Sequence, residues 1–393
     1  MPVSDKTAEG MRQSSWIRRM FEAGGELRKR LGAENVFDLS LGNPEDEPPP
    51  EFRQELAYQA QNPRAGMHRY MANAGYEATR DAVAGAISSE LGLSFQGSDV
   101  IMTCGAAAGL NVILKALLNI GDEVIVPSPY FPEYLSYIDN HGGVARLVDS
   151  GDDFLPDPDK IKHAITKKTR ALILNTPNNP TGVVYDSILL KKLADVLEES
   201  SQRFGQTIYI ISDEPYRRLI YDDQKFSSPL NHYHQSIMAT SFSKDLSLPG
   251  ERIGYIAVNP DIEEKSELLA GFVYANRILG FVNAPALMQN VVTNLQNVTV
   301  SVAEYQRRRD YLYEGLIEAG YEAVKPQGAF YLFPKTPAED DAAFVQHLME
   351  YGVLGVPGSG FGRKGYMRLS FCVNQATLEG AVKGLGKAIR GWR

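Results

Sequence analysis

The feature that most constrains the fold is a regular alternation of short apolar runs and amphipathic stretches between residues 77 and 211. The apolar runs predict strands, and the stretches between them have helical spacing. Strands are expected at 100–103, 123–126, 144–148, 170–174 and 207–211, and helices at about 77–91, 105–119, 131–140 and 189–204, with one more helix before residue 170. Strands that alternate with helices form a mostly parallel sheet covered on both faces, so we predict an α/β fold.

The pattern changes after Asp261. Long helical patterns cover about 261–279 and 285–319, and the remaining chain predicts strands at 329–333 and 367–373 and helices at 342–351 and 377–390. This is the pattern of a smaller α+β domain, which we expect the N-terminal segment to complete. That segment has an amphipathic stretch at 15–31, a short strand at 37–41 and a turn-rich linker at 42–50. We therefore predict a large domain at 45–285 and a small domain made of 1–44 and 286–393.

Composition excludes several classes of function. The 393 residues carry a formal net charge of −8, so a nucleic-acid or anionic membrane partner is not expected. Only two cysteines occur, Cys104 and Cys372, which fits a reducing compartment and gives no metal-binding spacing. No apolar run approaches the roughly 20 residues that a membrane-spanning helix needs, and the charged N-terminus lacks the apolar region of a secretory signal. We expect a cytoplasmic protein.

The polar loop Ser241–Gly254 places Lys244 among hydroxyls and glycines, between predicted strands at 236–240 and 252–258. Taken alone, such a lysine is an ordinary surface cation. Several other polar segments also follow predicted strands, and in open α/β sheets ligands bind at the carboxyl ends of the strands. The role of Lys244 therefore depends on the chemistry of these neighbouring segments.

The segment Cys104–Gly109 follows a strand and opens a helix. Its small residues let backbone N–H groups approach an anion at the positive end of the helix dipole, which suits a phosphate. Close packing of small side chains is the alternative explanation. The segment matches neither the dinucleotide-binding glycine pattern nor the P-loop pattern.

Two further strand ends carry polar groups. Asn175–Gly182 holds asparagines between prolines, and composition alone reads it as a loop of turn-forming residues. Asp213 ends an apolar strand, and Tyr216 follows it. An acid in that place is either a solvent-facing charge or the partner of a cation, such as a protonated ring nitrogen.

Two residues elsewhere also allow either a ligand-binding or a structural interpretation. Phe131 follows a strand and could stack on a flat ligand ring or simply pack in the core. Arg368 lies inside a predicted strand, where a buried guanidinium needs an anion. That anion is either a substrate carboxylate or an acidic side chain of the protein.

Taken together, these residues supply a phosphate site, a stacking ring, an acid for a ring nitrogen and a lysine for a Schiff base, which is the set that pyridoxal 5′-phosphate requires. The motifs NNPTG at 178–182, DEPY at 213–216 and SFSKxxxLPGxRxG at 241–254 occur in that order. From about Phe37 onward the chain resembles a fold-type I, class I/II aminotransferase of the aspartate aminotransferase superfamily. The resemblance implies a mostly parallel, seven-stranded-type sheet in a large cofactor-binding domain.

The resemblance implies roles for individual residues. Lys244 matches the lysine that forms the internal aldimine and then moves the proton. Asp213 matches the acid that keeps the pyridine nitrogen protonated. Phe131 matches the stacking ring, and Asn179 and Tyr216 match the pair that bonds the ring's 3′-oxygen. The remaining matches are Asn175 in the same loop wall; Gly105, Ala106, Ala107, Ser241 and Arg252 at the phosphate; and Gly42, Asn179 and Arg368 at the substrate carboxylate.

The resemblance also implies partners and a reaction. Tyr70 matches a tyrosine that reaches the phosphate from the neighbouring subunit, so a homodimer is expected. The implied activity is transfer of an amino group from an L-amino acid to a 2-oxo acid, expected to be 2-oxoglutarate, by a ping-pong mechanism. A carbon–sulfur β-lyase on the same fold is the alternative, and a cofactor-binding regulator is a remote one, because only about 40 residues precede the fold.

The sequence leaves the substrate open. The loop at 104–107 lacks the hydroxyl or lysine side chain that family members often carry there. Arg277 does not align cleanly with the second arginine of aspartate-specific relatives. Phe281, Phe330 and Tyr331 indicate an apolar or mixed pocket. Aspartate, alanine and aromatic amino acids all remain possible donors.

Overall fold

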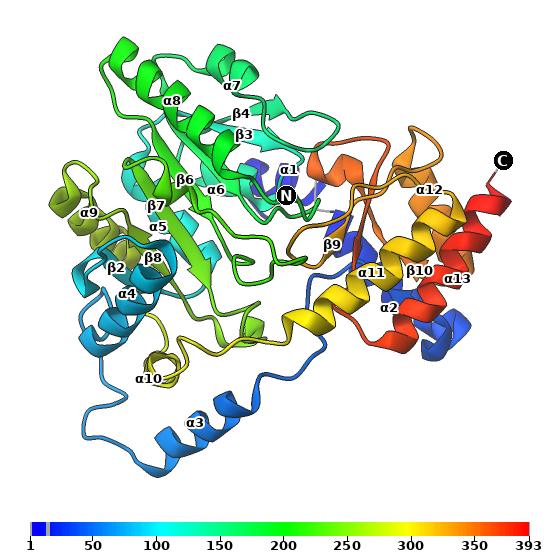
Figure 1. The fold of residues 1–393 in the computed structure, drawn as a ribbon, viewed down its shortest axis with the longest axis horizontal. Coiled ribbons are helices and arrows are strands. Elements are labelled where there is room, and N and C mark those ends of the chain that lie inside the picture. Colours follow the sequence, from blue (N-terminus) through cyan, green and yellow to red (C-terminus); the bar gives the residue numbers. More distant parts are fainter. Residues whose placement is uncertain (1, 13–15, 393) are drawn as a thin grey trace.

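The computed structural model describes residues 2–12 and 16–392, and its centre is a seven-stranded sheet (Figure 1). The strand order is β2-β8-β7-β6-β5-β3-β4. The strands are β2 (Val100–Thr103), β3 (Glu123–Ser128), β4 (Val144–Asp149), β5 (Thr169–Asn175), β6 (Tyr209–Asp213), β7 (Ser236–Ser241) and β8 (Gly254–Val258). Strands β4, β3, β5, β6 and β7 pair in parallel, whereas β8 is antiparallel to both β2 and β7. The predicted mostly parallel α/β sheet is confirmed.

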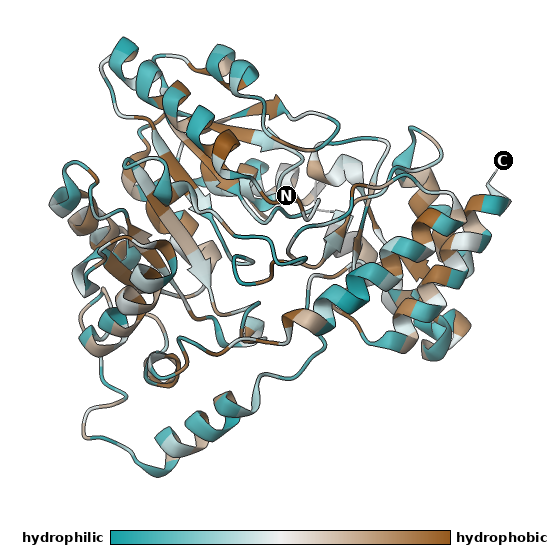
Figure 2. Cartoon of the chain, in the orientation of Figure 1, coloured by the Kyte–Doolittle hydropathy of each residue, from teal (hydrophilic) through white to brown (hydrophobic). Residues whose placement is uncertain are grey.

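Successive residues of β5 show why the sheet is buried on both faces. Leu172 and Leu174 pack in a core with α8, while Ala171 and Ile173 pack in a second core with α5. Side chains alternate between the faces of a strand, so a strand covered on both sides must be apolar at every position. Figure 2 accordingly shows hydrophobic colour along the strands and hydrophilic colour on the outer sides of the helices.

The helices that lie around this sheet are α1 (Asp5–Arg12), α4 (Glu77–Leu91), α5 (Ala106–Leu117), α6 (Glu133–Asn140), α7 (Pro158–Ala164), α8 (Ser187–Phe204) and α9 (Lys265–Ile278). Helix α3 (Pro50–Gln61) lies apart from the sheet and packs against α10 (Ala286–Thr293) (Figure 1). Helix α8 begins two residues before the predicted start at Leu189, because the Asp186 side chain caps it by accepting a hydrogen bond from the backbone N–H of Leu189 at 2.7 Å. Helix α5 begins directly after β2, with Gly105 at its N-cap.

The remaining elements form smaller sheets and a helical layer (Figure 1). Strand β1 (Phe37–Asp38) pairs in parallel with β10 (Val353–Leu354), and β12 (Met367–Ser370) pairs antiparallel with both β11 (Val356–Pro357) and β9 (Tyr331–Leu332). Helices α11 (Val302–Ala319) and α13 (Gln375–Gly391) lie side by side, with α2 (Trp16–Leu31) and α12 (Asp341–Leu348) nearby. The domain boundaries at 44/45 and 285/286 stay a prediction. Residue 15, where the predicted N-terminal helix starts, lies outside the described residues.

The expected helix at 285–319 is wrong as a single element. The chain forms α10 (Ala286–Thr293) and then α11, with Asn294–Ser301 between them. In that segment the backbone N–H of Val300 bonds the carbonyl of Asp245 at 2.8 Å, and the Ser301 hydroxyl caps α11. Tertiary hydrogen bonds therefore override an apolar pattern that reads as continuous helix.

The strand predicted at 252–258 is two residues too long at its start. Arg252 has φ 53°, a left-handed conformation, and β8 begins at Gly254. In the described part of the chain, no helix is long and apolar enough to cross a membrane.

Candidate active site

A cavity of about 300 Å³ opens at the carboxyl ends of the central strands. Segments that follow β2, β3, β5, β6 and β7 line one side of it, and Gly42, Tyr331 and Arg368 line the other. Every predicted site residue lines this cavity except Gly105 and Tyr70. The structure thus brings together residues from strands far apart in the sequence, as expected when parallel strands end at one edge.

Lys244 lies in the turn after β7 and reaches across the cavity. Its Nζ donates a hydrogen bond to the carbonyl oxygen of Gly42 at 2.8 Å. The pKa of Lys244 is lowered to about 8, chiefly by burial; Cys372 opposes this shift, and the Arg368 and Arg252 cations add to it. An amine with this pKa is partly neutral near physiological pH, so it can act as a nucleophile or a base.

Asp213 ends β6 and is 6% exposed. Tyr134 of α6 donates a hydrogen bond to its Oδ2, and Asn175 donates to its backbone carbonyl at 2.9 Å. Its other oxygen, Oδ1, is buried and has no hydrogen-bond partner among the described residues. Burial raises the pKa of Asp213 to about 7, and the bond from Tyr134 works in the opposite direction.

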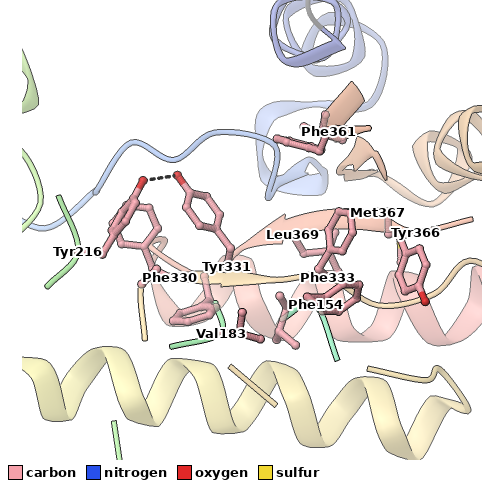
Figure 3. Close-up of a cluster of buried hydrophobic side chains, with 14 of the residues drawn as sticks. Phe154, Val183, Tyr216, Phe330, Tyr331, Phe333, Phe361, Tyr366, Met367 and Leu369 are labelled. Atoms are coloured by element: carbon pink, nitrogen blue, oxygen red, sulfur yellow. Dashed lines mark hydrogen bonds between the residues drawn. The ribbon is translucent and has the colours of Figure 1, made fainter. Parts of the chain in front are cut away.

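Tyr216 and Tyr331 meet at the cavity wall, as Figure 3 shows. Their hydroxyls are 3.0 Å apart and share a hydrogen bond, and their rings make an edge-to-face contact. Tyr331 comes from β9, so this bond ties the central sheet to the three-stranded sheet. A Cβ added at Gly42 would lie 1.8 Å from the Tyr331 hydroxyl, which explains why only glycine fits at position 42.

Arg368 lies in β12 with its guanidinium between two rings. Its Cζ is 4.6 Å from the Tyr331 ring centre and 4.7 Å from that of Phe361. It donates to the Asn179 side chain at 3.1 Å and to the Ser40 carbonyl at 2.6 Å. Its Nε is buried without a partner among the described residues. Because no carboxylate pairs with it in the described chain, this cation can bind an anion from solution.

The opposite end of the cavity suits a second anion. The first residues of α5, Ala106 and Ala107, line the wall there, together with Ser241 and Arg252. Gly105 precedes them with φ 87°, and a Cβ at this position would come within 2.8 Å of the Arg252 guanidinium. Free helix N–H groups, a hydroxyl and a guanidinium therefore converge on one point.

Two predicted residues do not line the cavity of this chain. Gly105 acts only through its backbone, as the N-cap of α5. Tyr70 is 88% exposed on the surface.

The sequence did not predict Glu133 in the cavity wall, the hydrogen bond from Tyr134 to Asp213, or the hydrogen bond between the hydroxyls of Tyr331 and Tyr216. Glu133 and Tyr134 follow the Pro129–Phe131 segment that was singled out, so proximity to that strand end could have suggested them.

Among the described residues, no group of three or more His, Cys, Asp or Glu side chains could hold a metal ion.

Comparison with known proteins decides the family. The family model of aminotransferase class I and II matches residues 34–385. The chain belongs to this family. It is therefore a pyridoxal-phosphate-dependent aminotransferase of fold type I, and membership implies pyridoxal 5′-phosphate as the cofactor.

Relatives of this aminotransferase agree. A probable aspartate aminotransferase of Methanocaldococcus jannaschii is 32% identical, over 90% of this chain and 93% of its own. An aspartate/prephenate aminotransferase of Thermus thermophilus is 34% identical, over 93% of both chains. A crystal structure of an aminotransferase from Eubacterium rectale superposes with a TM-score of 0.95 at 37% identity, covering 99% of this chain and 98% of that one.

Proposed function

We propose that this aminotransferase moves the amino group of an L-amino acid to a 2-oxo acid in two half-reactions, with Lys244 as the residue that holds the cofactor covalently. The observation that carries the proposal is one cavity containing an amine of lowered pKa, a buried carboxylate with an unpartnered oxygen and an unpaired guanidinium. 2-Oxoglutarate is the acceptor that we predict from the family resemblance.

The cavity fits pyridoxal 5′-phosphate. The unpartnered Oδ1 of Asp213 needs a donor, and a protonated pyridine nitrogen is one. The start of α5, Ser241 and Arg252 would hold the phosphate. Phe131 offers a ring face, and the Tyr216 hydroxyl and Asn179 amide offer hydrogen bonds to the ring oxygen. These groups complement the ring, the phosphate and the oxygen of the cofactor.

When bound, pyridoxal 5′-phosphate supplies an electron sink for the electrons left at the substrate's α-carbon. The side chains of the protein would bind the substrate, move the proton and stabilise the charge on the ring nitrogen. Arg368 would bind the α-carboxylate and so orient the Cα–H bond. Lys244 would take the proton from Cα and return one later, which its lowered pKa favours. Asp213 would keep a negative charge beside the ring nitrogen.

The proposed domain division would put Gly42, Tyr331 and Arg368 on the small domain, and Lys244 and Asp213 on the large one. The cavity would then lie between the domains, and closure would exclude water from the reacting atoms.

We also propose a homodimer in which Tyr70 reaches the partner's cofactor phosphate. The support is the family resemblance at Tyr70 together with its exposure: the side chain is 88% exposed and is therefore available to a neighbouring subunit. Sedimentation of the loaded enzyme should give twice the chain mass, and Tyr70→Phe should weaken cofactor binding. A fully active monomer would overturn the dimer. The cytoplasmic location stays a prediction from charge and cysteine content.

The function is tested by donor profiling. The loaded enzyme is mixed with a panel of amino acids, and 2-oxoglutarate or pyruvate is added as acceptor. We expect donor-dependent formation of the new amino acid only with an acceptor. Release of pyruvate or ammonia from cysteine-type donors without an acceptor would instead identify a β-lyase.

A further inference from the structure

Glu133, the first residue of α6, lines the same cavity as Arg368 and Lys244. Its Oε2 is buried and has no hydrogen-bond partner among the residues that the structure describes. None of the roles assigned above uses this carboxylate. A buried carboxylate oxygen without a donor costs free energy, so a donor from a bound molecule is favoured there.

Glu133 and Arg368 line the same cavity, and the Arg368 cation acts on the pKa of Glu133. Burial raises the pKa of Glu133, whereas its own backbone N–H and the Arg368 cation lower it. The negative charge of Glu133 in turn contributes to the raised pKa values of Tyr331 and Tyr137. Because Glu133 and Arg368 line one cavity of about 300 Å³, a substrate whose α-carboxylate is bound by Arg368 would place its side chain within reach of Glu133.

Each cation that lines the cavity already has a role in the proposed function. These cations are Lys244, Arg252 and Arg368, which the proposed function uses for the cofactor's covalent link, its phosphate and the substrate's α-carboxylate. Within the described chain, no cation lining the cavity is left for a second substrate carboxylate. An anion occupies that neighbourhood instead, and like charges in a partly buried site repel.

We propose that Glu133 determines the substrate class: it favours amino donors and oxo acids whose side chain carries an uncharged or cationic hydrogen-bond donor, such as an amide or an amine, over those with a second carboxylate. This inference rests on the proposed function and narrows it. It predicts that aspartate and glutamate are poorer donors than their amide-bearing counterparts, and that a monoamide oxo acid is a better acceptor than 2-oxoglutarate, the acceptor expected from the family resemblance. A site built to hydrogen-bond a group discriminates strongly against an analogue that leaves the buried group unpaired.

A purely structural role for Glu133 makes a different prediction. An acid in the first turn of a helix stabilises the helix through the dipole and the free N–H groups. Removing it would then lower thermal stability without changing which ligand binds. The exposed Asp139 near the end of the same helix, which pairs with Lys6, provides a matched removal of one negative charge outside the cavity.

The test compares glutarate with its monoamide, glutaramate, by calorimetric titration into the cofactor-loaded enzyme. The two probes have the same length and differ only in the distal group. We expect the wild type to bind glutaramate about tenfold more tightly, because a hydrogen bond to a charged group replaces a repulsion. In Glu133→Gln the two affinities should become equal within about twofold, and Asp139→Asn should keep the wild-type ratio.

Each outcome decides the proposal. Equal affinities in the wild type, tighter glutarate binding, an unchanged ratio in Glu133→Gln, or no detectable glutaramate binding would each overturn it. Glu133→Asp, which keeps the charge, should retain the preference for the monoamide. Donor profiling reports on the proposed function separately: if amino transfer occurs but the binding ratio does not respond to Glu133, only the substrate assignment fails.

Discussion

Tyr134 donates a hydrogen bond to one oxygen of the Asp213 carboxylate, and the other oxygen of this cavity-lining residue is buried without a partner among the described residues. The two residues come from α6 and β6, which are about 80 positions apart in the chain. Tyr134 therefore orients Asp213 and opposes the effect of burial on its pKa.

Tyr134→Phe should weaken cofactor binding about tenfold, because it removes a hydrogen bond to a charged group. Loss of that bond raises the pKa of Asp213 above its present value of about 7. The carboxylate form then becomes dominant only at higher pH. Fluorescence titration with pyridoxal 5′-phosphate from pH 6 to 9 should show the midpoint of affinity shifted upward. Tyr137→Phe, on the same helix, should leave the midpoint in place.

Asp213→Asn should stabilise the cofactor-free protein above pH 7 by an amount on the order of 2 kcal/mol while weakening cofactor binding. The pKa of Asp213 is about 7 in the folded chain and 3.8 in its ordinary state. The folded protein therefore binds more protons between pH 4 and pH 7, and its free energy of unfolding falls as pH rises through that window. Thermal unfolding of the cofactor-free wild type and variant at pH 5 and pH 8 measures the stabilisation by Asp213→Asn and the pH dependence of the wild type. A wild-type stability that rises over this window would contradict the assignment.

Lys244 should react with pyridoxal 5′-phosphate with a half-maximal rate near pH 8, because only the neutral amine is nucleophilic and its pKa is about 8. An ordinary surface lysine would need a pH above 10. Borohydride trapping followed by peptide mass spectrometry gives the modified residue and the pH profile. Lys244→Ala should show no trapped cofactor at this peptide and should lose nearly all amino transfer. Substantial turnover by this variant would rule out the covalent role.

Arg368→Lys should raise KM for amino donors and oxo acids by about tenfold or more, with a smaller change in kcat. Lysine keeps the charge but loses the planar fork that binds a carboxylate with two hydrogen bonds and stacks between Tyr331 and Phe361. Steady-state kinetics with both substrate types provides the measurement. Arg363→Lys is the control, since Arg363 pairs with Asp152 outside the cavity. An unchanged KM would mean that the carboxylate binds elsewhere.

Much of the fold and of the candidate site follows from local patterns. The alternation of apolar runs with helical spacing predicts the parallel sheet, because a strand buried on both faces must be apolar throughout. Asp213, Lys244 and Arg368 could be singled out because each is a charged group in or beside an apolar strand, where it needs a partner. Only the family resemblance turned these separate strand ends into one site.

Local patterns could not supply the rest. The segment 285–319 reads as one helix, but the Val300 N–H donates to the Asp245 carbonyl and the Ser301 hydroxyl accepts from the Glu304 N–H, so α11 begins anew after α10. The sequence indicates only that Tyr331 lies in the pocket and that Glu133 and Tyr134 lie near a strand end, and it gives no sign of the hydrogen bonds or the unpartnered oxygen that make them important. Their importance depends on where α6 and β9 pack against the edge of the sheet.

The sequence by itself determined the sheet, the family resemblance and the charged residues at the strand ends. Only the tertiary structure decided which oxygen of Asp213 is unpartnered, what holds the Arg368 guanidinium and that the Glu133 carboxylate lines the same cavity. The physical reason is that hydrophobic periodicity is a local property of the chain, whereas hydrogen-bond partners and desolvation come from contacts between segments far apart in sequence.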